Sequence, residues 1–132
     1  MRNARILIVD DDPTNIALLE GILGDEGFTE FVSTTDPRRV LELCREFHPN
    51  LILLDLHMPN LDGLGVLECI SEAFRGEEFP PVMVLTADAT PATRKIALAA
   101  GATDFLTKPF NNTEVLLRIA FLLDSHGCTS PE

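Results

Sequence analysis

The chain has 132 residues and a mass of 14.5 kDa, enough for one domain of ordinary size with its own hydrophobic core. Hydrophobic residues make up 45% of the chain, which is typical of globular proteins and excludes a disordered one. Its 21 acidic and 10 basic side chains give a formal net charge of −11, which opposes direct binding to nucleic acid or to an anionic membrane surface. The longest apolar runs are far shorter than the about 20 residues of a membrane-spanning helix, so we expect no membrane span.

The N-terminal segment indicates where the protein is located, and the cysteines indicate whether it has disulfides or a zinc site. The apolar run that follows Arg5 is too short for a secretion signal, so we expect a cytoplasmic protein. The three cysteines are an odd number without CxxC spacing, and they predict neither a disulfide framework nor a zinc site. Cys44 and Cys69 stand among apolar residues at helical spacing and are predicted to be small core residues, whereas Cys128 lies in a polar segment.

Short continuous apolar runs alternate along the chain with longer segments of helical spacing. The runs are predicted to be buried strands, and the segments in which apolar residues recur every three or four positions are predicted to be helices. In chain order the predicted elements are strand 5–9, a helix from 13 to near Gly24 or Gly27, strand 29–33, helix 37–47, strand 51–54, helix 64–70, strand 82–85, helix 92–100, strand 104–107 and helix 114–123.

Three helix starts share one local signal, a capping residue followed by proline. Asp12-Pro13, Asp36-Pro37 and Thr90-Pro91 each place an N-cap residue before a proline at the first helical position. The whole pattern is a β–α unit repeated five times, which implies a parallel sheet covered by helices on both faces. Because such crossovers are right-handed, the predicted fold class is α/β with a doubly wound sheet.

Polar side chains follow four of the predicted strands. Asp10 and Asp11 come after the first strand, Asp55 after the third, Thr86 after the fourth and Lys108 after the fifth. In an open parallel sheet, ligands bind outside the carboxyl ends of the strands, where the strand order reverses. We therefore predict that three carboxylates, a hydroxyl and an ammonium group converge at one edge of the sheet.

Such a cluster of carboxylates predicts a bound cation. Clustered carboxylates repel one another and raise each other's pKa values unless a positive charge lies among them. A site made of oxygen atoms alone favours a hard cation such as Mg²⁺. Asp12 is interpreted as a helix cap and the His57 side chain as a loop residue rather than as ligands. The chain has neither GxGxxG nor GxxxxGK[ST], so the site suits a small phosphoryl group rather than a nucleotide.

Four sequence blocks in order resemble the receiver (REC, CheY-like) domain of two-component response regulators. They are residues 6–13 (ILIVDDDP), residues 53–59 (LLDLHMP) with Asp62-Gly63, residues 84–87 (VLTA), and Gly101-Ala102 with Phe105 and Lys108-Pro109-Phe110. The resemblance implies a (βα)5 flavodoxin-like fold with strand order 2-1-3-4-5 over residues 5–123. Residues 124–132 would then be a short polar tail or a truncated linker.

The resemblance also implies a role for each carboxylate. Asp55 would be the phosphoacceptor that attacks a phosphohistidine of a partner. Asp10, Asp11 and Asp55 would hold Mg²⁺, with the backbone carbonyl of His57 as a further ligand.

Three further residues receive roles from the same resemblance. Lys108 would pair with the phosphoryl oxygens, and its bond to Pro109 is expected to be cis. Thr86 would donate a hydrogen bond to a phosphoryl oxygen. Phe105 would be an aromatic switch that moves inward as Thr86 shifts. These roles agree with the positioning and charge neutralisation that phosphoryl transfer requires.

The implied function is that of a signalling domain rather than an enzyme with many turnovers, with self-catalysed phosphoryl transfer and slow autodephosphorylation. Its partners would be a sensor histidine kinase or histidine phosphotransfer protein, together with an output domain or effector protein. Arg94, Lys95, Asp104 and Arg118 fall on the surface of the last two helices and the last strand. They are interpreted either as pairing across a two-fold axis in a phosphorylation-dependent homodimer or as solvated surface charges.

Two other functions fit part of the sequence. Residues 10–14 (DDDPT) match the DxDxT motif of haloacid-dehalogenase-like phosphatases, in which Asp10 would be the nucleophile and Asp12 the general acid. That interpretation leaves residues 55–59 without a role. A receiver-like binding module that is never phosphorylated would be expected to lack some of the site residues, and none is lacking.

Overall fold

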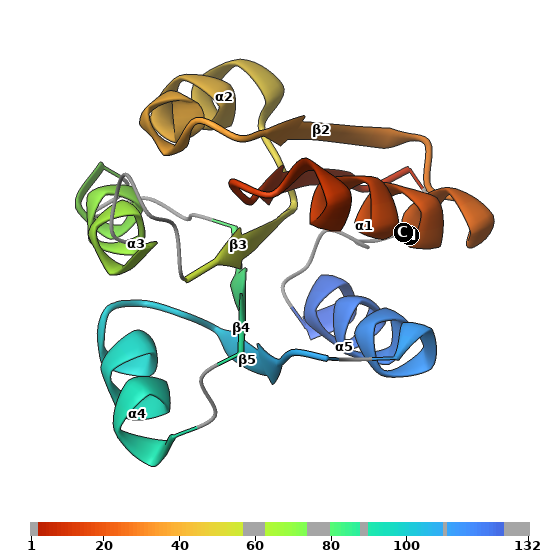
Figure 1. Cartoon of the computed structure of the whole chain (residues 1–132). Coiled ribbons are helices and arrows are strands. Elements are labelled where there is room, and N and C mark those ends of the chain that lie inside the picture. Colours follow the sequence, from red (N-terminus) through yellow and green to blue (C-terminus); the bar gives the residue numbers. More distant parts are fainter. Residues whose placement is uncertain (1–2, 57–62, 74–79, 88–89, 110, 126–132) are drawn as a thin grey trace.

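The computed structural model describes residues 3–56, 63–73, 80–87, 90–109 and 111–125 (Figure 1). Its five strands form one parallel sheet in the order β2-β1-β3-β4-β5. The elements in chain order are β1 (Arg5–Val9), α1 (Pro13–Asp25), β2 (Glu30–Thr34), the 3₁₀ helix η1 (Pro37–Arg39), α2 (Val40–Phe47), β3 (Leu51–Asp55), α3 (Gly63–Ala73), β4 (Val82–Thr86), α4 (Pro91–Ala99), β5 (Asp104–Thr107) and α5 (Asn112–Ser125).

The helices form a layer on each face of the sheet, as the doubly wound prediction requires. Figure 1 shows α1 and α5 on one face, and α2, α3 and α4 on the other. The chain passes from β1 to β2 on one side and then returns to place β3 on the other side of β1. The strand order therefore reverses between β1 and β3, the position at which ligands bind in such sheets.

The core consists of two apolar layers, one on each face of the sheet. In β3, Ile52 and Leu54 belong to the layer under α2, α3 and α4, whereas Leu51 and Leu53 belong to the layer under α1 and α5. Every residue of β3 and β4 is buried, which explains why these strands appear in the sequence as continuous rather than alternating apolar runs. In the part of the chain that the structure describes, no helix has both the length and the apolar character needed to cross a membrane.

The three predicted helix caps are present. Asp12 Oδ1 accepts the backbone N–H of Thr14 at 3.0 Å, and Asp36 Oδ1 accepts that of Arg38 at 3.0 Å. Thr90 Oγ1 accepts the backbone N–H of Thr93 at 3.3 Å. The second predicted helix differs in one respect, because its first turn is the separate 3₁₀ helix η1. Such tight turns are frequent at helix N-termini.

Element boundaries differ from the predicted ones by one to three residues, most at the end of α3, which reaches Ala73 instead of residue 70. β2 ends at Thr34 instead of residue 33, because Thr34 pairs with Val9 and is buried. The last helix extends beyond the predicted 114–123 at both ends, to Asn112 and Ser125. Polar residues at helix ends carry little periodic signal, so the apolar pattern underestimates the length of α5.

The prediction for the cysteines is correct for Cys44 and wrong for Cys69. Cys44 is buried in α2, and this burial raises the pKa of its thiol to about 11. Cys69 is exposed, because α3 turns Val66, Leu67 and Ile70 towards the sheet and leaves Cys69 beyond the edge of that stripe. Cys128 lies outside the described residues.

Candidate functional site

The sheet brings together the polar residues that follow its strands. Asp10 comes directly after β1, Asp55 and Thr86 are the last residues of β3 and β4, and Lys108 follows β5. All of these strands run in the same direction, so their ends lie along one edge of the sheet. The convergence predicted from strand ends is therefore present in the fold.

Three carboxylates form a tight cluster at the reversal in strand order. One oxygen atom from each of Asp10, Asp11 and Asp55 lies within 4.8 Å of the other two. Asp10 and Asp55 are only 1% and 5% exposed, whereas Asp11 is partly exposed. The cluster thus has a buried floor and one side open to solvent.

Lys108 brings the positive charge that faces this cluster. Its Nζ lies 3.6 Å from Asp10 Oδ2 and 3.5 Å from Asp55 Oδ1, and its side chain is 22% exposed. The backbone N–H of Lys108 donates to the carbonyl of Thr86 at 2.7 Å, which fixes the start of the following loop against β4. The Lys108–Pro109 peptide bond is cis, as the resemblance implied.

The pKa of Asp10 is raised above its ordinary value, and burial is the largest cause. The negative charge of Asp55 raises it further, as the predicted repulsion among carboxylates requires. The backbone N–H of Asp12, 2.9 Å from Asp10 Oδ1, and the positive charge of Lys108 act in the opposite direction. The fold therefore disfavours the carboxylate form of Asp10 despite a cation on one side of it.

The cluster fits a hard divalent cation. Asp10 Oδ2 is the one buried side-chain nitrogen or oxygen atom without a hydrogen-bond partner in the described part of the chain, so it is available as a ligand. The donor atoms are carboxylate oxygens, which Mg²⁺ prefers. Beside them lies a groove of about 450 Å³ lined by Asp11, Asp12, Pro13, Asn15, Asp55, Ala87 and Lys108. The predicted backbone ligand, His57, lies outside the described residues.

Thr86 and Phe105 lie on one face of the sheet, on the neighbouring strands β4 and β5. Thr86 is fully buried, and Phe105 is 5% exposed within the apolar layer under α2, α3 and α4. Phe105 pairs in register with Val84, two residues before Thr86 on the neighbouring strand. Both side chains therefore point to the α4 side, and the Phe105 ring already occupies an inward position.

The match to a protein-family model accounts for this combination of fold and site. The model for the response regulator receiver domain matches residues 6–120. This chain belongs to that family. The haloacid-dehalogenase alternative is thereby set aside, and the strand order 2-1-3-4-5 agrees with the fold that the family resemblance implied.

Relatives and solved structures agree with the receiver family. The chain is 37% identical to "Transcriptional regulatory protein PrrA" of Mycobacterium tuberculosis over 96% of its own length and 52% of the relative. It is 36% identical to "DNA-binding response regulator MtrA" of Mycolicibacterium smegmatis over 87% of its length and 48% of the relative. The receiver thus spans about half the length of these curated relatives.

Among solved structures, the receiver is similar to a CheY-like receiver domain protein from Methanospirillum hungatei, with a TM-score of 0.84 and 28% identity. This match covers 97% of our chain and 99% of that one. The chemotaxis protein CheY4 of Vibrio cholerae gives a TM-score of 0.83 at 27% identity, covering 91% of our chain and 98% of that one.

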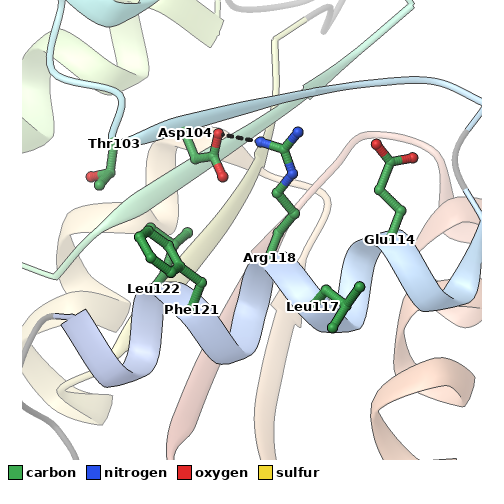
Figure 2. Close-up of a pocket in the computed structure, with 7 residues that line it drawn as sticks. All are labelled: Thr103, Asp104, Glu114, Leu117, Arg118, Phe121 and Leu122. Carbon is green, nitrogen blue, oxygen red and sulfur yellow. Dashed lines mark hydrogen bonds and ion pairs between the residues drawn. The ribbon is translucent and has the colours of Figure 1, made fainter.

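Two contacts of the receiver were not predicted from its sequence. Arg118 Nη1 donates to Asp104 Oδ1 at 2.8 Å within one chain (Figure 2). The guanidinium carbon of Arg94 lies 5.9 Å from the centre of the Phe105 ring. Both contacts join a helix to β5, and their existence depends on how that helix crosses the strand, which local sequence does not encode.

A second groove lies between β5 and α5. It has a volume of about 560 Å³ and is lined by Thr103, Asp104, Glu114, Leu117, Arg118, Phe121 and Leu122 (Figure 2). Leu117 and Phe121 are 66% and 67% exposed, which is high for side chains of this size. Exposed apolar side chains that gather beside an ion pair are typical of a surface that binds another protein.

Proposed function

We propose that this receiver accepts a phosphoryl group on Asp55 from the phosphohistidine of a sensor histidine kinase or a histidine phosphotransfer protein. In this step a carboxylate oxygen of Asp55 forms a bond to phosphorus, and the bond from phosphorus to the donor imidazole breaks. The leaving imidazole keeps the electron pair of that bond and takes up a proton. The observation that carries the proposal is the position of Asp55, beside Lys108 and two further carboxylates in an open groove.

Each residue around Asp55 contributes to positioning or to charge neutralisation. Asp10, Asp11 and Asp55 would hold Mg²⁺ together with the backbone carbonyl of His57, and the bound ion would supply positive charge next to the phosphoryl oxygens. Lys108 lies close enough to Asp55 to pair with another of these oxygens. The Thr86 hydroxyl, at the end of the adjacent strand, would donate a hydrogen bond to the modified Asp55.

Phosphorylation would then act on the surface formed by α4, β5 and α5. Thr86 lies on β4, between Asp55 on β3 and Phe105 on β5, so a shift of Thr86 towards the phosphoryl group would favour the inward position of the Phe105 ring. The product would be a signalling state that is lost by slow autodephosphorylation. Because the phosphohistidine donor is formed from cytoplasmic ATP, the proposal places the receiver in the cytoplasm.

The output would pass through a partner or an attached output domain. In the proposal, residues 5–123 act as the receiver and residues 124–132 as a polar tail or the start of a linker. MtrA is named as a DNA-binding protein. The net charge of −11 opposes such binding by this receiver itself, so contact with DNA would belong to an output domain or effector.

We further propose that the phosphorylated receiver pairs with a second copy through the α4–β5–α5 surface. Leu117 and Phe121 offer apolar area there, and Arg94 and Lys95 on α4 are exposed basic residues that can meet an acidic residue such as Glu114 of another copy. A two-fold axis would use each such pair twice. The Asp104–Arg118 pair already forms within one chain, so it would flank the interface rather than create it.

A small phosphodonor separates the receiver proposal from its rival. Incubation with acetyl phosphate and Mg²⁺ should load one phosphoryl group per chain, followed by slow release of phosphate. Asp55→Asn should abolish loading. Asp12→Asn should load normally, since Asn is as good a helix cap as Asp. Sustained release of phosphate over many turnovers, with a requirement for Asp12, would instead support the phosphatase function.

A further inference from the structure

A short series of neighbouring residues connects the phosphoryl site with Arg94 on the surface. Asp55 pairs in register with Leu85, directly before the buried Thr86. Phe105 lies on the same face of the sheet as Thr86, on the neighbouring strand. The guanidinium carbon of Arg94 lies 5.9 Å from the centre of the Phe105 ring, within the range of a cation–π interaction.

Helix α4 buries little of its own surface, so a contact of one of its exposed side chains with the core can affect its position. Ala97 is the single buried residue of α4, a helix that the structure describes in full. At the C-terminal end of α4, Ser71 Oγ donates to the carbonyl of Ala100 at 3.1 Å. Nearer the N-terminal end, the Arg94 side chain reaches over Phe105. Elements with few buried apolar contacts have low local stability, so we expect the position of α4 to respond to a change in one contact.

We propose that Arg94 is a positioning residue whose guanidinium holds the Phe105 ring in its inward position and thereby favours the phosphorylated state of Asp55. The inference rests on the proposed function, in which inward Phe105 accompanies phosphorylated Asp55. The coupling is reciprocal, because two events that favour the same state strengthen each other.

The position of the ring can be measured without any phosphoryl group. The chain has neither Trp nor Tyr, so Phe105→Trp introduces a single fluorescent indole at the position of the ring. In that background, Arg94→Ala should shift the emission to longer wavelength, as the indole becomes more exposed to water. Arg94→Lys should retain most of the original emission, because the ammonium group also binds an aromatic face. Arg45→Ala, an equal loss of charge from an exposed site on α2, should leave it unchanged.

The coupling to Asp55 is tested with the phosphoryl mimic beryllofluoride and Mg²⁺. With Phe105 in place, bound and free beryllofluoride are measured by ¹⁹F NMR, at a protein concentration where sedimentation shows monomer. Arg94→Ala should raise the half-saturating concentration about 2- to 5-fold, as expected for loss of an exposed cation–π contact. Arg94→Lys should lie close to wild type, and Arg45→Ala should equal it.

Failure of the proposed role of Arg94 can be distinguished from failure of the proposed function. Equal half-saturating concentrations for Arg94→Ala and Arg45→Ala, with wild type binding normally, would overturn the role of Arg94 and leave the proposed function intact. An unchanged emission maximum in Arg94→Ala would also overturn it. If the wild type does not bind beryllofluoride at all, the proposed function fails and the coupling fails with it.

Discussion

Asp10 shows how a single residue can lower stability in order to form a site. Its side chain is 1% exposed, and burial is the main reason that its pKa is raised. A raised pKa means that the folded state holds the proton more tightly than the unfolded chain. The stability that this residue contributes is therefore present below the unfolded value of 3.8 and is lost as pH rises through the folded value. Ionisation of Asp10 therefore opposes folding of the metal-free receiver.

Asp10→Asn should therefore raise the melting temperature of the receiver in EDTA at pH 7. The neutral amide avoids burying a charge, and the difference from wild type should shrink as pH falls towards 3.8. Millimolar Mg²⁺ should raise the melting temperature of the wild type by binding its folded state, and should have much less effect on the variant. Differential scanning fluorimetry measures both effects.

The matched control is Asp12→Asn, which removes the same charge two residues away and keeps the helix cap. It should leave the response to Mg²⁺ nearly intact. A lower melting temperature of Asp10→Asn in EDTA would show that the ion pair with Lys108 outweighs the cost of burial. An undiminished response to Mg²⁺ would remove Asp10 from the metal site.

Local sequence patterns predict those helices and strands whose position depends on interactions between neighbouring residues. Continuous apolar runs correctly locate β1, β3 and β4, because both faces of this sheet are covered. Asp-Pro pairs locate helix starts, because the cap and the first turn are formed by adjacent residues. Cys69 is wrongly placed in the core, because the width of the buried stripe of α3 depends on its packing against the sheet. The pairs Arg94–Phe105 and Asp104–Arg118 depend on tertiary geometry in the same way.

The candidate site, like the fold, could be predicted only in part from local sequence. Its residue types and their positions after strands could be predicted, because parallel strands end at one edge. The family resemblance implied the individual roles, which no periodic pattern encodes. The contacts of Lys108 with both Asp10 and Asp55 depend on the path of the loop after β5. Distances of this kind are set by the fold as a whole.

Replacing Gly21 or Gly101 by alanine should change the stability of the receiver in opposite directions. Gly21 lies exposed within α1 with open space around its Cα, so Gly21→Ala should raise the free energy of unfolding by about 1 kcal/mol through helix propensity. Gly101 has a φ of 121°, and a Cβ there would collide with Ser71 Oγ, so Gly101→Ala should destabilise the receiver. Urea denaturation measures both. Destabilisation by Gly21→Ala would contradict the open surroundings of α1.

In the whole molecule, the carboxylate site and the α4–β5–α5 surface that would respond to phosphorylation lie in different places. The carboxylates lie at the carboxyl edge of the sheet, whereas Leu117 and Phe121 lie along the outer side of α5. β5 joins the two, since it carries Phe105 and leads directly to Lys108. A change at Asp55 can therefore reach the α4–β5–α5 surface through one short strand.

Beryllofluoride with Mg²⁺ should shift the receiver from monomer to dimer in sedimentation velocity experiments. Phe121→Asp should prevent this shift, because it places a charge in the apolar part of the proposed interface. Leu18→Asp makes a matched change at a site on α1 that is 52% exposed, and it should leave dimerisation intact. A monomer in both states would exclude the second copy and leave a different protein as the partner.

The residue that carries the phosphoryl group decides whether Asp55 is the phosphoacceptor. The receiver is loaded with acetyl phosphate and Mg²⁺, reduced with borohydride to convert the acyl phosphate into a stable alcohol, and digested for mass spectrometry. We predict that the modified residue is Asp55, whose Oδ1 lies 3.5 Å from Lys108 Nζ at the end of β3. Modification of Asp10 in place of Asp55, or the absence of any modified aspartate, would contradict it.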